Sequence, residues 1–166
     1  MTKSKKYKTA ALKSSQDTDF YKKFSLRKDK ADRLNDIRDY KPVFAFDYIS
    51  LNESKFCFNS TLINGRKDYG RLFQSLKDIS SKSYNELSTN YTYHFHEADF
   101  KDNKFSISRS DFLKCISQDI NSVTEDNTPT VYQFKVFEEA RIFGFVFNGV
   151  FYLVFFDRGH NAYKRK

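Results

Sequence analysis

Two apolar runs on either side of Asn148-Gly149 constrain the fold of this chain more than any other feature of the sequence. The runs are RIFGFVF at residues 141–147 and VFYLVFF at residues 150–156. Asn-Gly favours a two-residue type I′ turn, in which both central residues have positive φ. The pattern therefore predicts an antiparallel hairpin. Because the second run is almost wholly apolar, it predicts a strand inside the sheet with both faces covered.

The remaining apolar patterns predict an α+β domain. Segments 43–51 and 55–63 are rich in Phe and β-branched residues and predict a hairpin or two neighbouring strands. Segments 91–100 and 130–137 predict further strands. Two segments show helical spacing, with apolar residues at Leu72, Phe73, Leu76 and Ile79, and at Phe112, Leu113, Ile116 and Ile120. We expect an antiparallel sheet packed against two or three helices.

The N-terminal segment differs from the rest of the chain in charge. Residues 1–41 hold 13 Lys or Arg against 6 Asp, a net charge of +7, whereas the other 125 residues hold 16 basic and 15 acidic side chains, a net charge of +1. Pro42 disfavours helix at the residue before it. We expect a basic, partly disordered or helical arm at 1–41 and a single α+β domain at 42–166. Such an arm favours a polyanion partner, RNA above all, although a lysine-rich tail can also simply aid solubility.

Cysteine usage and hydropathy indicate the compartment. Cys57 and Cys115 are far apart and match no metal-ligand spacing, so reduced thiols are expected. The N-terminus has no apolar stretch typical of a secretory signal. No apolar run approaches the roughly 18–20 residues of a membrane span. These features predict a soluble, cytoplasmic protein without a membrane partner.

Polar and basic side chains gather where the last predicted strand ends. They are Asp157, Arg158, His160, Tyr163, Lys164 and Arg165. Arg141 opens the partner strand across the turn, so an antiparallel hairpin places it at the same end of the sheet. The sequence predicts a polar site at this rim.

The stretch YQFKVFEEARIFGFVFNGVFYLVFFDRGHNAYKR, residues 132–165, resembles the C-terminal half of RelE-family toxins of bacterial toxin–antitoxin pairs. The shared order is a strand of Tyr-x-x-Lys character, a turn, an Arg-led strand, an apolar strand, Gly-His or Gly-Lys, and a Tyr. Residues 43–88 and the ending RIxGF…FYxxxxDxxH are also similar to short bacterial and phage proteins, a likeness that names no activity.

The RelE resemblance implies ribosome-dependent endonucleolytic cleavage of messenger RNA without a metal or other cofactor, and an antitoxin as a protein partner. Lys135 would stand at a family lysine position, and Arg141 would contact the phosphate. Tyr163 would stack on or orient a base. His160 or Arg158 would supply the remaining proton-transfer or phosphate-binding group. Cations and a positioned proton donor are what such a transition state requires.

Further cations would bind the nucleic acid around these catalytic candidates. They are Lys164 and Arg165 at the end of the chain and Lys5, Lys6 and Lys8 in the arm. The sequence also departs from the family pattern. Gln133 stands where the family has a lysine, Asn161 replaces a basic residue after Gly-His, and Glu138 and Glu139 would repel phosphate.

Other interpretations stay open. Arg141 can be a structural partner of Asp157, and the departures favour a non-catalytic binding protein of a phage or mobile element that grips nucleic acid or a protein. His94 and His96, two apart in a predicted strand and followed by Glu97 and Asp99, form a weaker metal-site hypothesis together with His160. We expect no metal.

Overall fold

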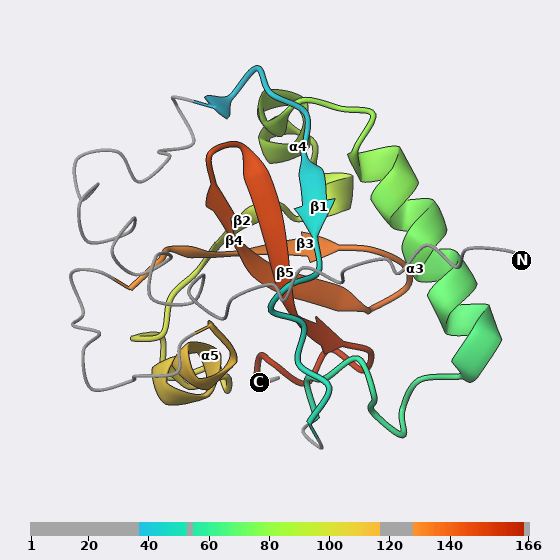
Figure 1. The fold of residues 1–166 in the computed structure, drawn as a ribbon, viewed down its shortest axis with the longest axis vertical. Coiled ribbons are helices and arrows are strands. Elements are labelled where there is room, and N and C mark those ends of the chain that lie inside the picture. Colours follow the sequence, from blue (N-terminus) through green and yellow to red (C-terminus); the bar gives the residue numbers. More distant parts are fainter. Residues whose placement is uncertain (1–36, 53–54, 117–127, 165–166) are drawn as a thin grey trace, which may run out of the picture.

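The described residues of the computed structural model are 37–52, 55–116 and 128–164, and Figure 1 shows how their elements are arranged. The greater part of the predicted arm, including Lys5, Lys6 and Lys8, lies outside these residues, as does Arg165. Among the described helices, none has the length and apolar character needed to cross a membrane.

One five-stranded sheet forms the centre of the fold. Its strands are β1 (Val43–Ala45), β2 (His96–Ala98), β3 (Val131–Lys135), β4 (Arg141–Phe147) and β5 (Val150–Asp157). They lie in the order β1-β5-β4-β3-β2. All neighbours are antiparallel except β1 and β5, which run parallel, so the sheet is mixed. With its helices, this confirms the predicted α+β class.

The β4–β5 hairpin confirms the strongest sequence pattern. Asn148 and Gly149 both have positive φ, at 50° and 77°, as a type I′ turn requires. A β-bulge interrupts the pairing after Phe143. At the bulge, a Cβ on Gly144 would lie 2.0 Å from the Tyr152 carbonyl oxygen, so only glycine allows this approach of the strands.

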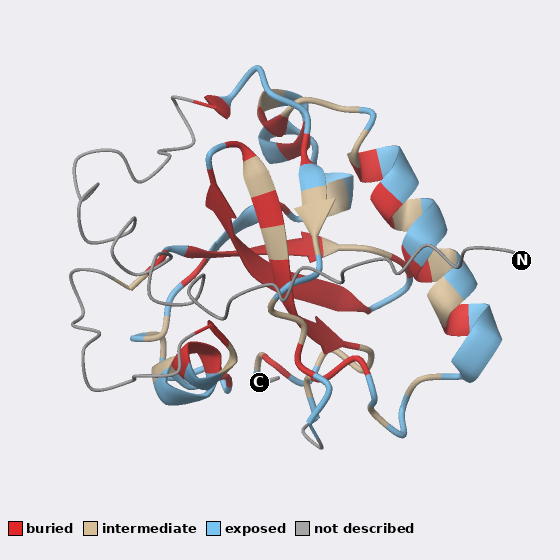
Figure 2. Ribbon diagram, viewed as in Figure 1, coloured by how far each residue is buried: buried red, intermediate tan, exposed pale blue. Residues whose placement is uncertain are grey.

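Two helices cover one face of the sheet. They are α3 (Gly65–Ile79) and α4 (Tyr84–Thr89), followed by the 3₁₀ helix η2 (Tyr91–Tyr93). The buried side of α3 belongs to the hydrophobic core on this face of the sheet, and its outer side is exposed (Figure 2). Helix α4 is separate from α3 because Ser83 caps its start, in a capping box with Glu86.

Helix α5 (Arg109–Ile116) covers the opposite face of the sheet. The Ser108 side chain accepts a hydrogen bond of 3.0 Å from the Asp111 backbone N–H and so caps the start of the helix. Ile120 lies outside the described residues. Strand β5, between β1 and β4, contributes buried residues to both cores, which confirms that both of its faces are covered.

The predicted strand pairing between 43–51 and 55–63 is wrong. Only Val43–Ala45 forms a strand, and it pairs with β5 rather than with the second segment. The second segment consists of turns that still bury apolar side chains, since the Phe58 ring stacks on Phe156 at 5.5 Å. Its apolar side chains are buried without strand pairing, which explains why its composition resembles that of a strand.

The strand predicted at 91–100 is much shorter than expected. Residues 91–93 form η2, and His94 follows in the left-handed conformation with φ 44° and ψ 42°. Strand β2 begins only at His96. His94 and His96 therefore do not share a face of one strand, contrary to the prediction.

Residues upstream of position 42, the expected start of the domain, already pack with it. Ile37 is buried in the core beside α3 and α4. The Arg38 and Tyr40 carbonyls accept hydrogen bonds from the first turn of α4, at 2.7 Å from the Asn85 N–H and 2.9 Å from the Tyr84 N–H. Residues 37–41 thus pack with the body of the protein.

Candidate functional site

The predicted rim forms across three strands. Lys135 of β3, Arg141 of β4 and Asp157 of β5 are register partners, so they form one row across the end of the sheet. Gln133, two residues before Lys135, lies on the same face because side chains alternate along a strand. This face is the one covered by α5 and the C-terminal segment. Below, the rim means these four residues with Glu139, His160 and Tyr163.

Arg141 is almost completely buried, with 5% of its side chain exposed. Its Nη1 donates to the Ala140 carbonyl at 3.1 Å, and Nη2 lies 4.0 Å from Oε2 of Glu139. Burial lowers the pKa of the guanidinium, and the negative charges of Glu139 and Asp157 act in the opposite direction. Arginine stays charged in proteins, so the carboxylates compensate a buried cation.

Asp157 closes the row from the other side. Its side chain is fully buried, and Oδ2 accepts a 2.7 Å hydrogen bond from the Ala162 backbone N–H. This bond fixes the C-terminal segment over the end of the sheet. From there, backbone hydrogen bonds join residues 162–164 to residues 104–106.

Three buried side-chain atoms of the rim have no hydrogen-bond partner among the described residues. They are Oε1 of Gln133, Nε of Arg141 and Oδ1 of Asp157. Such atoms are rare in folded proteins, and each costs about 1–3 kcal/mol. The rim combines one unpaired donor with two unpaired acceptors, so it lowers the stability of an otherwise well-packed sheet.

His160 and Tyr163 lie at the edge of the row. Nδ1 of His160 is 3.4 Å from Oε2 of Glu139, the same oxygen that faces Arg141. The rings of His160 and Tyr163 are 6.4 Å apart. Burial, with the charges of Asp102 and Asp99, raises the pKa of Tyr163 to about 12. Its hydroxyl is therefore protonated at neutral pH and can donate a hydrogen bond but cannot act as a base.

Two further histidines lie at this end of the sheet. The His96 ring contacts the amide of Gln133. Burial, and then the positive charges of Arg141 and Lys135, lower the pKa of His94. Sequence reasoning grouped both with His160 as a weak metal-site hypothesis and did not place them beside Gln133, because only strand order brings β2 beside β3. No group of three or more potential metal ligands exists among the described residues.

Arg158 and Lys164 are not part of the row. Arg158 donates from Nε to Oδ2 of Asp68 at 2.7 Å and from Nη2 to Oε2 of Glu138 at 2.9 Å. Its guanidinium lies 5.1 Å from the centre of the Phe137 ring, on the face covered by α3. Lys164 is exposed, and its backbone N–H bonds to the Lys104 carbonyl.

Comparison with protein families gives one match. The model of a family described as "Uncharacterised protein UU032" matches residues 51–166, from the segment before α3 to the end of the chain. The chain belongs to the UU032 family. No curated protein and no solved structure matches it. The match includes the whole rim of this UU032-family protein and leaves out β1.

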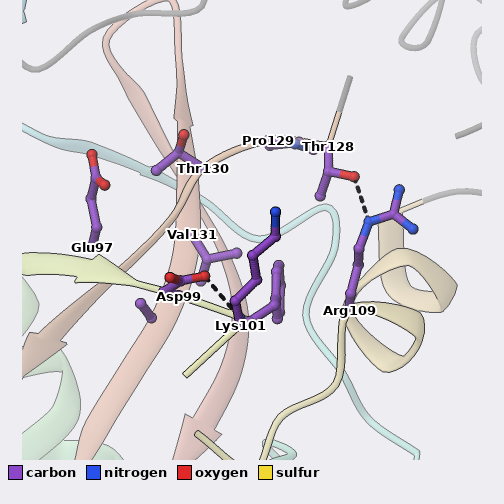
Figure 3. Close-up of a pocket in the computed structure, with 10 residues that line it drawn as sticks. Glu97, Asp99, Lys101, Arg109, Thr128, Pro129, Thr130 and Val131 are labelled. Carbon is purple, nitrogen blue, oxygen red and sulfur yellow. Dashed lines mark hydrogen bonds between the residues drawn. The ribbon is translucent and has the colours of Figure 1, made fainter. Parts of the chain in front are cut away.

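This UU032-family protein also has a cleft of about 420 Å³ at the opposite end of β3 (Figure 3). Its charged lining residues are Glu97, Asp99, Lys101 and Arg109. Nε of Arg109 donates to Oγ1 of Thr128 at 2.8 Å. The two acidic and two basic side chains balance, so the cleft has no net preference for a phosphate or for a cation. Of the sequence-based hypotheses, only the metal-site residues Glu97 and Asp99 fall here.

Proposed function

We propose that the protein binds nucleic acid, single-stranded RNA in the first place, without cleaving it. The burial of Arg141 is the observation that carries this choice. A cation that stabilises a transition state must face the reacting phosphate. Here the guanidinium is 95% covered and held among Ala140, Glu139 and Asp157.

The carboxylates around the rim support the same conclusion. An approaching phosphate would meet the exposed Glu139 before it met Arg141. The cation of Arg158 is engaged by Asp68 and Glu138. Carboxylates thus compensate the charges of both Arg141 and Arg158, in line with the structural role of Arg141 that the sequence left open.

The charge distribution supports binding. The net charge is +8, and residues 1–41 contribute +7 of it. Each phosphate neutralised by a lysine or arginine releases counterions, so affinity falls with salt by a slope of about −0.7 per contact for single strands. A basic segment next to a nearly neutral domain is suited to this sequence-independent attraction.

The test is a titration of a fluorescent 20-nucleotide RNA with the full chain at several salt concentrations. Replacing Lys5, Lys6 and Lys8 together by alanine should weaken binding and reduce the salt slope by about 2, for three lost contacts. The matched control replaces three exposed lysines of the body, Lys55, Lys104 and Lys114, and changes the net charge equally. No binding by the parent chain, or equal effects of both triple variants, would contradict the proposal.

An RNA endonuclease is the second candidate. It is favoured by the meeting of Lys135, Arg141, His160 and Tyr163 at one end of the sheet, as the RelE resemblance implies. Its test adds the protein to a defined translation reaction and maps new messenger RNA ends. Lys135→Ala and His160→Asn are suitable variants, because Lys135 is partly exposed and asparagine tolerates the positive φ of 54° at position 160. Cleavage by the parent, lost in these variants, would replace binding by catalysis as the function.

A further inference from the structure

The outer side of α3 carries an exposed aromatic ring. Phe73 is 57% exposed although it lies in the middle of a 15-residue helix. The ring of Phe46, which follows β1 and is 43% exposed, lies 6.5 Å from it. Figure 2 shows the exposed outer side of α3 opposite the buried side that packs on the sheet. Two adjacent exposed phenylalanines from distant segments form a platform that the core does not use.

Basic side chains flank this platform. Arg66 and Lys77 lie seven residues before and four residues after Phe73, and therefore on the same side of the helix. Lys67 adds a third cation near Arg66. All three are exposed and form no ion pair with any described residue.

Acidic side chains do not neutralise this side. Asp68, in the same helix, is buried and bonded to Arg158. Asp78 binds Lys82 at 2.5 Å and accepts a hydrogen bond from the Tyr93 hydroxyl. The exposed Asp47 follows Phe46 in the sequence. The side as a whole is basic.

Gly70 leaves the surface of α3 open beside Phe73. It lies three residues before Phe73 on the same side, and a Cβ at this position would meet nothing within 4 Å. Its φ is not positive, so the helix does not require glycine there. Glycine inside a helix costs about 0.8–1.0 kcal/mol relative to alanine. The missing side chain leaves the helix backbone open to close approach by another molecule.

We propose that single-stranded nucleic acid binds along this surface, the α3 strip, formed by Arg66, Gly70, Phe73, Lys77 and Phe46. A base stacks on the Phe73 ring, beside the Phe46 ring that is tilted by 45° to it. The strand passes over Gly70, while Arg66 and Lys77 bind phosphates on either side. The inference rests on the proposed function, and it adds a nucleic-acid site on the folded domain to the basic arm.

The dimensions of the strip fit an unpaired strand. Arg66 and Lys77 are eleven residues apart, about 16 Å along the helix axis. Aromatic rings between cations are the usual means of holding unpaired bases, since every base has a face that can stack. A duplex keeps its bases paired and cannot use the rings, so its binding would depend on charge alone.

The experiment measures fluorescence anisotropy of labelled oligouridine, oligodeoxythymidine and a duplex of equal length with the full chain. Phe73→Leu, which keeps an apolar side chain, should weaken binding of the single strands about tenfold, and Phe73→Tyr should retain it. Lys77→Glu should weaken binding at low salt. Its matched control is Lys114→Glu, since Lys114 also lies in the last turn of an exposed helix, on the other face of the sheet. Unchanged melting temperatures show that the variants are folded.

The outcomes separate the two proposals. If the parent binds no polynucleotide, both are overturned. If the parent binds and Phe73→Leu binds equally well, only the α3 strip is overturned, because the arm then suffices. Light scattering that shows a dimer, abolished by Phe73→Leu, would also overturn it, since the platform would then join two copies. We expect equal affinity for oligouridine and oligodeoxythymidine, because both offer bases for stacking and phosphates. Tighter binding of oligouridine would identify RNA as the natural partner of the α3 strip.

Discussion

The rim and the α3 strip both combine cations with aromatic rings, yet their charges are in opposite states. At the rim, Arg141 is buried between carboxylates, and Tyr163 is packed against Phe105 at 5.0 Å. On the strip, Arg66 and Lys77 are exposed and Phe73 is 57% exposed. The same residue types can therefore complete a fold in one place and be available to a ligand in another.

The comparison shows that gathering cations does not by itself make an anion site. Sequence reasoning found the rim because its residues are close together at the end of the chain. It passed over the strip because helical spacing had assigned Phe73 to the core. Compensation of charge decides between the two regions, and only the three-dimensional contacts reveal it.

The largest expected effect comes from the sheet that supports the rim. Gly144→Ala should cost more than about 4 kcal/mol or prevent folding, because its Cβ would meet the Tyr152 carbonyl oxygen at 2.0 Å and the Phe151 ring at 2.7 Å. Circular dichroism and urea denaturation measure this loss. An unchanged unfolding midpoint would mean that β4 and β5 are not held this closely, and the closed state of the rim would be in doubt.

Asp157→Ala tests charge compensation directly. The variant leaves the Ala162 N–H without its acceptor and the buried Arg141 with Glu139 alone, so we expect a loss of about 3 kcal/mol in urea denaturation. Asp157→Asn keeps an acceptor and isolates the contribution of the charge. A loss below about 1 kcal/mol for the alanine variant would indicate a solvated, open rim and would break the comparison.

Arg158→Met tests the ion pair on the α3 side of the sheet and should cost about 2 kcal/mol at neutral pH. The hydrogen bond from Arg158 lowers the pKa of Asp68, so the pair stabilises the protein above the unfolded pKa of about 4. This contribution is lost as the pH falls through the lowered pKa. The difference in the free energy of unfolding between parent and variant should therefore become smaller in acid.

Lys164→Met is the control for that variant, because it removes an exposed cation near the same end of the chain. It should leave stability within about 0.5 kcal/mol of the parent at every pH. A difference in the free energy of unfolding between the parent and Arg158→Met that stays constant from neutral pH to pH 2 would contradict the role of Asp68.

The smallest expected change concerns the strip. Gly70→Ala should stabilise the protein by about 0.5–1 kcal/mol, because alanine favours the helix and its Cβ meets open space. It should at the same time weaken binding of single-stranded RNA. Stabilisation without weaker binding would show that Gly70 is not a point of approach for the ligand.

Local chemistry determined much of this protein from its sequence. Asn148-Gly149 fixed the hairpin because both residues accept positive φ, and Ser108 started α5 because its hydroxyl accepts a backbone N–H. Lys135, Arg141 and the residues after β5 could be placed at one rim because antiparallel strands joined by short turns return to the same end. These patterns involve residues near one another in the chain.

Tertiary structure decided what no local pattern could. The position of β1 beside β5 depends on which sheet edge is open, and the hydrophobic composition of segment 55–63 is satisfied equally well by turns that bury Phe58. Arg141 became a buried ion because Asp157 and the C-terminal segment lie over it, and Phe46 met Phe73 because β1 ends beside α3. Burial and charge compensation arise from residues distant in sequence, so they follow from the assembled fold and cannot be predicted from spacing along the chain.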